Sequence, residues 1–303
     1  FTSETAYSYG AYVAERYCDD DHVAVLYIAG EFNWPEENLD IWTQMTQGIV
    51  DTCPDKLIAA HPRWFGGYEF QTTSHALHDL PGFSFNAIQS SLYGNCTNDP
   101  EHDRYLGTHN WLLVENDYAI TPTKPVFDAE ATYEMINAGH LSCKFPTVRW
   151  DAFGVRRRAY WSVFAGGFGH TYGANGVFQF HQSDWPQTQF APLHTWDVAI
   201  HYEGATQMGL MRLLMESRPF ADRIPAQDRF VSDPMITVPD HQHATRDASG
   251  RWMMVYIPES NRTVTMDVSV MSGSTLDLWW FDPRDGTTSL FDTVNIDDLP
   301  NGE

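Results

Sequence analysis

The stretch HVAVLYIAGEFNW, residues 22–34, begins like a buried β-strand and ends in polar side chains. Residues 23–28 are almost all apolar, which is typical of a strand covered on both faces. The chain then reaches Glu31, Asn33 and Trp34. A carboxylate, an amide and an indole directly after such a strand indicate a functional site rather than a core position.

The same pattern recurs along the first two thirds of the chain. We expect further strands over 57–60, 83–88 and 125–129, which are followed by His61, Gln89 and Glu130. Apolar spacing predicts helices around them, over 5–17, 37–51, 101–115, 155–168 and 198–216. Alternation of strand and helix implies an α/β fold with a parallel sheet, and in a β/α barrel all strand ends open onto the active-site face.

About five β/α units precede the change of sequence pattern near residue 229, whereas a closed barrel needs eight. The sequence therefore predicts a (β/α)8 TIM-type barrel that lacks its first three units and contains strands four to eight. We expect further residues before Phe1 and after Glu303 in a longer enzyme. An open five-stranded sheet is the alternative, and its exposed edge would need covering.

The pattern changes near residue 229. Short strands separated by turn signals follow, as in RWMMVYIP, RTVTMDVSV and LDLWWFDP, and no helical period is present. We expect a barrel domain over 1–225 and a small antiparallel β-sandwich over 229–303. Packing against the barrel is the favoured explanation of the aromatic residues in WWFDP.

Composition excludes several classes of protein. The chain has 303 residues, 43% of them hydrophobic, and a formal net charge of −22. That charge argues against a nucleic-acid partner, because a phosphate backbone would be repelled. No run of 18 apolar residues occurs, so we expect no membrane span.

Glu31 and Glu130 are the pair expected for glycoside hydrolysis, which needs one carboxyl group as acid and another as nucleophile or base. Structural or solvated glutamates are the alternative, since 40 acidic residues face only 18 Lys and Arg. His241 and His243 give a weak metal signal, for which exposure on the surface is the favoured explanation. We expect no metal or cofactor, because the sequence lacks a phosphate-binding loop and zinc-type spacings.

The segment VRRRAYWSVFAGGFGHTYGANGVFQF, residues 155–180, resembles the signature of the apiosidase-like glycoside hydrolases. YIAGEFN, LIAAHPR, FNAIQSS, KPVFDAEATYE and WWFDPRDG agree with that family in the same order. In such enzymes a barrel is followed by a small β domain named for collagen binding. We expect this domain to be structural or glycan-binding instead.

The resemblance implies an acid/base role for Glu31 and a nucleophile role for Glu130. Side chains that would contact substrate or brace the site are Asn33, Trp34, His61, Arg63, Gln89, Glu134, Arg156, His170 and Tyr172. The family usually has Asp at position 31, and its Gln-Ser-Gly-His is here Gln-Ser-Ser-Leu from Gln89 onward. These departures indicate a substrate other than apiose-containing pectin.

The sequence thus predicts a retaining glycoside hydrolase that binds and cleaves a polysaccharide or oligosaccharide by a two-carboxylate mechanism. A non-catalytic carbohydrate- or matrix-binding protein is the alternative. The spacing of the two carboxyl groups discriminates between them, since about 5–5.5 Å is typical of retaining and about 6.5–9.5 Å of inverting enzymes. A much wider gap would favour binding.

Four cysteines add a prediction about the compartment. Cys18 and Cys53 each lie four residues before a predicted strand, so in a barrel both lie in neighbouring loops at the amino-terminal face. Cys96 and Cys143 fall in neighbouring loops of the opposite face, which selects the pairs Cys18–Cys53 and Cys96–Cys143. Two disulfides imply secretion. Sequons at Asn95 and Asn261, as predicted glycosylation sites, agree with it.

Overall fold

The computed structural model describes residues 2–31, 38–63, 72–90, 110–137, 149–185, 190–234 and 240–299. The chain divides into two compact units. The first unit comprises Phe1–Ser90, Leu112–Glu130 and Gly167–His170, and the second comprises Ser91–Trp111, Ala131–Gly166 and Thr171–Glu303. Each unit is described by itself below.

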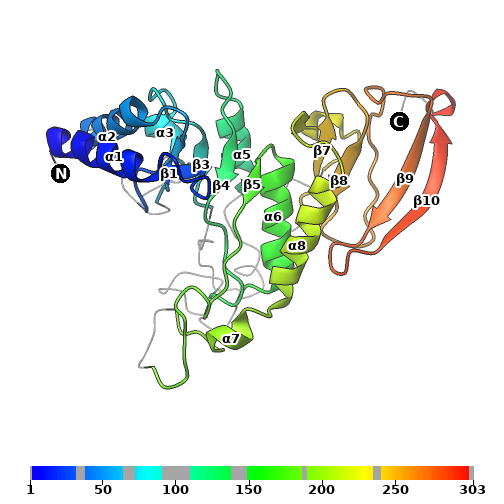
Figure 1. Ribbon diagram of the computed structural model, residues 1–303. Coiled ribbons are helices and arrows are strands. Elements are labelled where there is room, and N and C mark those ends of the chain that lie inside the picture. Colours follow the sequence, from blue (N-terminus) through cyan, green and yellow to red (C-terminus); the bar gives the residue numbers. More distant parts are fainter. Residues whose placement is uncertain are drawn as a thin grey trace. The chain divides into compact units, whose positions relative to one another are not determined.

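The first unit is a set of short parallel strands with helices between them in the chain (Figure 1). Strand β1 pairs with β2, and β3, β4 and β5 form a three-stranded sheet. A backbone bond from Ser84 N to Ile58 O, 2.8 Å, links the approach to β3 with β2. The elements are α1 (Ser3–Tyr17), β1 (Val25–Tyr27), α2 (Leu39–Thr52), β2 (Leu57–Ala59), α3 (Ser74–Leu77), β3 (Asn86–Ile88), α5 (Asn110–Tyr118), β4 (Val126–Asp128) and β5 (Gly169–His170).

Helices α1 and α2 pack with their backbones almost in contact. A Cβ on Gly10 would lie 2.2 Å from the carbonyl oxygen of Met45, and one on Gly48 would lie 2.2 Å from that of Tyr7. Only glycine fits such positions, because any side-chain carbon would overlap the facing backbone. The buried side chains around this contact include Ala6, Ala14, Trp42, Met45, Ile49, Leu26 and Ile58, and they form the core beneath β1 and β2.

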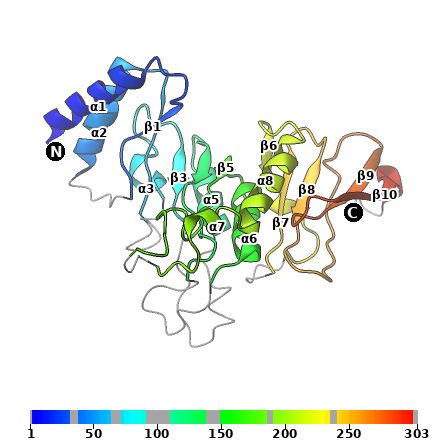
Figure 2. The ribbon, with the colours of Figure 1, turned by 60° about the horizontal axis from the view of Figure 1, so that its bottom comes forward.

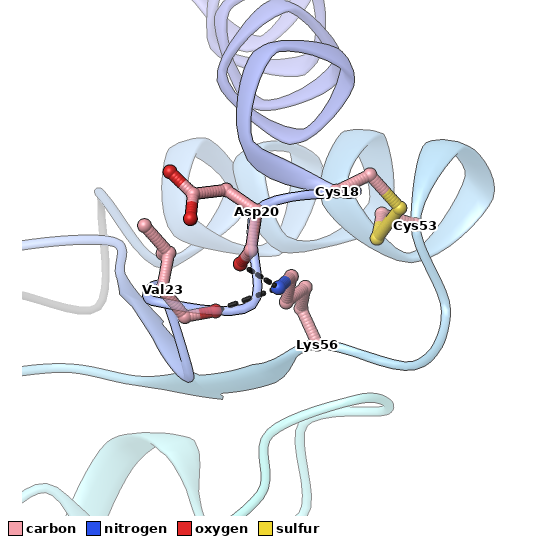
Figure 3. Close-up of a disulfide and its surroundings, with 5 residues drawn as sticks. All are labelled: Cys18, Asp20, Val23, Cys53 and Lys56. Atoms are coloured by element: carbon pink, nitrogen blue, oxygen red, sulfur yellow. Dashed lines mark hydrogen bonds between the residues drawn. A yellow bond between two sulfur atoms is a disulfide. The ribbon is translucent and has the colours of Figure 1, made fainter.

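The ends of these two helices are joined by the predicted Cys18–Cys53 disulfide (Figure 3). The Cα atoms of the two residues lie 5.7 Å apart. Beside it, the Lys56 ammonium group donates to the backbone oxygens of Asp20 and Val23, both at 2.7 Å, and so holds the loop that enters β1. The pair Cys96–Cys143 lies outside the described residues.

The second unit places two helices beside antiparallel sheets (Figure 2). Strands β6, β7 and β8 form one sheet in that order, and β9 and β10 form a hairpin, so the prediction of an antiparallel C-terminal region is confirmed. The elements are α6 (Ala152–Phe164), α7 (Trp196–Ala199), α8 (Glu203–Glu216), β6 (Arg223–Pro225), η3 (Gln227–Arg229), β7 (His243–Asp247), β8 (Met253–Tyr256), β9 (Thr275–Phe281), β10 (Thr288–Asn295) and η4 (Ile296–Asp298).

The single helix predicted over 198–216 is wrong at its start. The structure has the short helix α7 up to Ala199 and a separate α8 from Glu203. Tyr202 between them has extended backbone, with φ −59° and ψ 146°, and its hydroxyl bonds the Nδ1 of His194 at 2.9 Å. Continuous apolar spacing masks this break, because a turn between two helices can keep the same face inward.

Two expectations about side-chain exposure are also wrong. His241 and His243 are buried rather than on the surface, because the His241 ring stacks on Trp111 with centroids 4.1 Å apart. Trp279 and Trp280 are each 55% exposed, so packing does not explain the WW pair. In the described residues the β9–β10 hairpin has no third strand, so its outer edges are unpaired.

Three general features of the fold bear on function. The described residues form an α/β structure, but their strands do not close into a barrel. None of the described helices is both long and apolar enough to cross a membrane. Asn261, in the second predicted sequon, is exposed in a bend and has a positive φ of 59°, whereas Asn95 lies outside the described residues.

Candidate active site

The candidate active site lies at the carboxyl ends of the parallel strands of the first unit. Parallel pairing brings these ends to one edge: His61 N bonds Ala29 O at 2.9 Å beyond β1 and β2, and Ala129 N bonds Ile88 O at 2.9 Å beyond β3 and β4. The predicted residues Glu31, His61, Gln89, Glu130 and His170 all stand at this edge. The strand-end pattern in the sequence therefore predicted which of these side chains stand at the same edge of this unit.

Glu31 is held by an amide. Gln89 is completely buried, and its Nε2 donates to Glu31 Oε1 at 2.8 Å. An amide donor stabilises the ionised carboxylate without adding charge of its own. Glu31 itself is exposed, so its other oxygen can reach a ligand in solvent.

Glu130 faces an imidazole. His61 Nε2 lies 3.4 Å from Glu130 Oε2, and the two side chains are only 19% and 15% exposed. His61 Nδ1 lies 2.8 Å from the carbonyl oxygen of Pro62. A carbonyl oxygen only accepts hydrogen bonds, so Nδ1 carries the proton and Nε2 is the nitrogen turned toward Glu130. The imidazole therefore lies against the Glu130 carboxylate through Nε2.

Both glutamates border the same cavity. It has a volume of about 600 Å³ and opens to solvent, and its polar lining residues include Glu31, His61 and Glu130. The rest of the wall is largely apolar and comes from β1 and from the facing sides of α1 and α2. A cavity of this size with a few convergent polar groups has the properties of a small-molecule site.

Sequence reasoning missed one group at this edge. The Asp128 carboxylate is fully buried at the end of β4, where Ser90 Oγ donates to it at 2.9 Å and 3.1 Å. The Nδ1 of His170 lies 3.5 Å from the same carboxylate. Asp128 thus joins the ends of β3, β4 and β5. A charged residue closing a buried apolar strand was the signal that could have found it.

Glu134 and Tyr172 belong to the second unit and form a buried pair. The Tyr172 hydroxyl donates to Glu134 Oε2 at 2.6 Å, and the backbone N–H of Gly204 donates to Oε1 at 3.3 Å. Burial raises the pKa of Glu134, and the hydrogen bond from Tyr172 opposes that rise. Burial, followed by the hydrogen bond to Glu134, raises the pKa of Tyr172. With only 4% of Glu134 exposed, this carboxylate braces its neighbours.

The remaining predicted residues divide as follows. Arg63 lies two residues beyond His61 and is partly buried. Arg156 is buried in α6 and donates to Gln207 Oε1 of α8. Asn33 and Trp34 lie outside the described residues. No cluster of three or more metal-ligating side chains occurs in the part of the chain that the structure describes.

Comparison with known proteins assigns both parts of the chain to sequence families. Residues 1–222 match the sequence family "Apiosidase-like, catalytic domain", and residues 224–300 match the "Putative collagen-binding domain of a collagenase". Among curated proteins, no match is found.

Two solved structures are similar over nearly the whole chain. One, described as a glycoside hydrolase, is 30% identical with a TM-score of 0.83, covering 97% of this chain and 64% of its own. The other is a family 5 glycoside hydrolase from Bacteroides vulgatus, 30% identical with a TM-score of 0.82, covering 97% and 61%. The chain thus spans less than two thirds of either relative.

The fold is that of glycoside hydrolases. More specifically, the chain belongs to the apiosidase-like family, as its motifs predicted.

Proposed function

We propose that the chain acts in a retaining glycoside hydrolase that cleaves a polysaccharide, with Glu31 as acid/base and Glu130 as nucleophile. The observation that carries this proposal is that both carboxylates border one cavity at the strand ends. The reaction needs two such groups beside the scissile bond, one to protonate the leaving oxygen and one to attack the anomeric carbon.

The two environments suit two different roles. Glu130 is mostly buried, and the imidazole of His61 lies 3.4 Å from its carboxylate, which limits the positions that this carboxylate can take. Glu31 is exposed and bonded through one oxygen to Gln89, which leaves the other oxygen to exchange a proton with the leaving group and then with water. His170, Arg63, Asn33 and Trp34 complete the proposed substrate-binding set of the first unit. Glu134 and Tyr172, also proposed for substrate binding, form their hydrogen-bonded pair within the second unit.

The remaining parts of the proposal concern the scaffold. We propose that the parallel strands belong to a (β/α)8 barrel over residues 1–225 and that residues 229–303 form a sandwich. The similarity to two glycoside hydrolases supports the first, and the two antiparallel sheets support the second. The Cys18–Cys53 disulfide supports secretion, because such bonds persist in oxidising compartments.

The test is hydrolysis of a panel of plant, algal and microbial glycans, with the anomeric form of the first product followed by NMR. Retention of configuration supports the two roles, and inversion contradicts the nucleophile role of Glu130. A Glu130→Gly variant that regains turnover with azide, giving a glycosyl azide of inverted configuration, would identify the nucleophile directly. Glycan binding without turnover in the unaltered protein would favour the non-catalytic alternative.

A further inference from the structure

A buried hydrogen bond connects the two strand ends that carry the candidate catalytic groups of the first unit. Ser90 lies directly after Gln89, two residues beyond the end of β3. Asp128 ends β4, two residues before Glu130. Ser90 Oγ lies 2.9 Å from one carboxylate oxygen of Asp128 and 3.1 Å from the other, so the two oxygens share its proton. This bond therefore links the segment of Gln89 with the segment of Glu130.

Both ends of this link are completely buried. Ser90, Gln89 and Asp128 each have an exposed fraction of 0%. An enclosed carboxylate holds its donors tightly, because a buried charge without them is costly and because a hydrogen bond to a charged group is a strong one. The backbone keeps the same two strands in register, with Ile88 opposite Asp128 and Ala129 N bonded to Ile88 O at 2.9 Å. Ser90 is therefore held closely against the end of β4.

Gln89 carries the effect of this link to Glu31. Its Nε2 donates to Glu31 Oε1 at 2.8 Å, so the position of the amide sets where that carboxylate oxygen is held. Glu31 is exposed, and a glutamate side chain without such a contact can rotate among several rotamers. Because Gln89 is the chain neighbour of Ser90, an anchor on Ser90 restricts the amide of Gln89 and, through it, the carboxylate of Glu31.

We propose that Asp128 is a positioning residue of the active site. Through Ser90 it fixes the amide of Gln89. That amide in turn orients Glu31 relative to Glu130. The inference rests on the proposed function, because it takes Glu31 as acid/base and Glu130 as nucleophile. It gives the buried charge at the end of β4 a purpose: the two reacting carboxyl groups stand on different strands, and a productive geometry requires that these strand ends stay in a fixed relation.

A second contact of Asp128 provides the alternative explanation. The Nδ1 of His170, whose side chain is 2% exposed, lies 3.5 Å from Asp128 Oδ2, and the two residues are opposite each other in β4 and β5. If the buried charge served only to hold this imidazole, removal of the Ser90 hydroxyl would leave Glu31 undisturbed. Separate substitutions of Ser90 and Asp128 therefore distinguish the two explanations.

The experiment uses the full chain and three single substitutions. Ser90→Ala removes the donor, and Asp128→Asn removes the charge while preserving the shape of the side chain. Ser84→Ala is the matched control, because Ser84 lies two residues before β3 and its Oγ accepts from Ile58 N at 2.9 Å. Thermal unfolding verifies that these variants and the double variant Ser90→Ala/Asp128→Asn are folded. If Asp128→Asn is not folded, Ser90→Ala and its control decide the outcome alone.

The first readout is NMR of the glutamine side-chain amides, which needs no substrate. The Gln89 signal is identified by its absence from the Gln89→Met variant. We expect the Nε2 protons of Gln89 to exchange with solvent about tenfold faster in Ser90→Ala and in Asp128→Asn, because the amide loses the anchor of its chain neighbour. Ser84→Ala leaves this rate unchanged. An unchanged rate in Ser90→Ala, or an equal increase in Ser84→Ala, overturns the proposal.

The second readout is kcat/KM for two substrates that differ in their leaving group: the glycan that the unaltered chain hydrolyses, and a dinitrophenyl glycoside of the sugar it releases. Cleavage of the glycan needs a proton from Glu31, whereas dinitrophenolate leaves without one. We expect Ser90→Ala and Asp128→Asn to lower kcat/KM by about a hundredfold for the glycan and by much less for the aryl glycoside. The double variant loses no more than Asp128→Asn, since both substitutions break one link. Equal losses on the two substrates contradict the proposal.

The inference and the proposed function fail in different ways. If the unaltered chain hydrolyses a glycan but Ser90→Ala behaves like Ser84→Ala, the positioning role is wrong and the proposed function stands. If the Gln89 amide responds as expected but no glycan of the panel is hydrolysed, the link between the strand ends stands and catalysis is wrong. If neither result is obtained, both are contradicted.

Discussion

The two units of the chain arrange their polar groups in opposite ways. In the first unit Glu31 and Glu130 border a cavity at the carboxyl ends of the strands, while the Cys18–Cys53 disulfide joins segments that precede β1 and β2. The candidate catalytic carboxylates and the disulfide therefore lie at opposite ends of the same strands. In the second unit Glu134 is buried against α8. The comparison shows that carboxylates following strands differ in access: Glu31 and Glu130 reach a cavity, whereas Glu134 is enclosed.

Glu130 provides the strongest test of this separation. Glu130→Gln removes the ionised oxygen but preserves shape, so turnover falls by roughly a thousandfold or more. The midpoint of thermal unfolding changes little, because the amide has the same shape as the carboxylate and can still contact His61. Glu15→Gln on the exposed side of α1 serves as the control and retains full activity. Normal turnover by Glu130→Gln refutes the assigned role.

The disulfide tests the opposite end of the strands. Replacing Cys18 and Cys53 by Ala removes a bridge across a sequence separation of 35 residues, which lowers the free energy of unfolding by roughly 3–4 kcal/mol in the chain-entropy description. Turnover per folded molecule stays unchanged, because the bridge lies away from the strand ends that carry the carboxylates. Urea unfolding and active-site titration measure the two quantities. If the fully folded variant lost specific activity, the disulfide and the carboxylates would not be independent of each other.

Two glycines of α8 sharpen the description of the second unit. A Cβ on Gly204 would lie 2.3 Å from Glu134 Oε2, whereas nothing lies within 4 Å of one on Gly209. Gly204→Ala therefore lowers the free energy of unfolding by about 1–3 kcal/mol, because the added methyl group overpacks this contact. Gly209→Ala in the same helix raises the free energy of unfolding by about 0.5–1 kcal/mol, because alanine has the higher helix propensity. Chemical denaturation of both variants checks the expected opposite signs, and equal signs would show that Glu134 does not pack closely on α8.

The smallest effect concerns the pH dependence of stability. Because burial raises the pKa of Glu134, the native carboxyl holds its proton to higher pH than the unfolded one. Its contribution to stability is full below the unfolded value, near 4.3, and is lost as pH rises through the folded value. Glu134→Gln, which cannot titrate, flattens the fall of the unfolding free energy with rising pH. If the unfolding free energy of that variant fell with pH as steeply as before, ionisation of Glu134 would cost the folded protein no stability.

The strand-end residues could be predicted from sequence because one local pattern was repeated. An apolar run followed by a polar residue marks each strand end, and parallel pairing brings these ends together without further information. Glu31, His61, Gln89 and Glu130 were found in this way. The Cys18–Cys53 bridge followed from equal offsets before two neighbouring strands.

Contacts across long sequence separations left no such pattern. Gly204 contacts Glu134 across a sequence separation of 70 residues, and no local pattern near either residue predicts this contact. His241 and His243 look like surface residues until Trp111, far earlier in the chain, covers them. Asp128 was overlooked because its neighbours are apolar, although its burial depends on Ser90 and His170 from adjacent strands. Polar groups inside a core are specified by partners, not by periodicity.

The contact of α1 with α2 limits how this protein can vary in evolution. Gly10 and Gly48 each face a backbone carbonyl at a distance that no side chain can share. A compensating substitution is impossible, because the opposing atom belongs to the main chain and cannot be exchanged for a smaller one. A saturation library selected for folding should therefore contain only glycine at these two positions. Tyr12, 59% exposed on the same α1, should accept most residues.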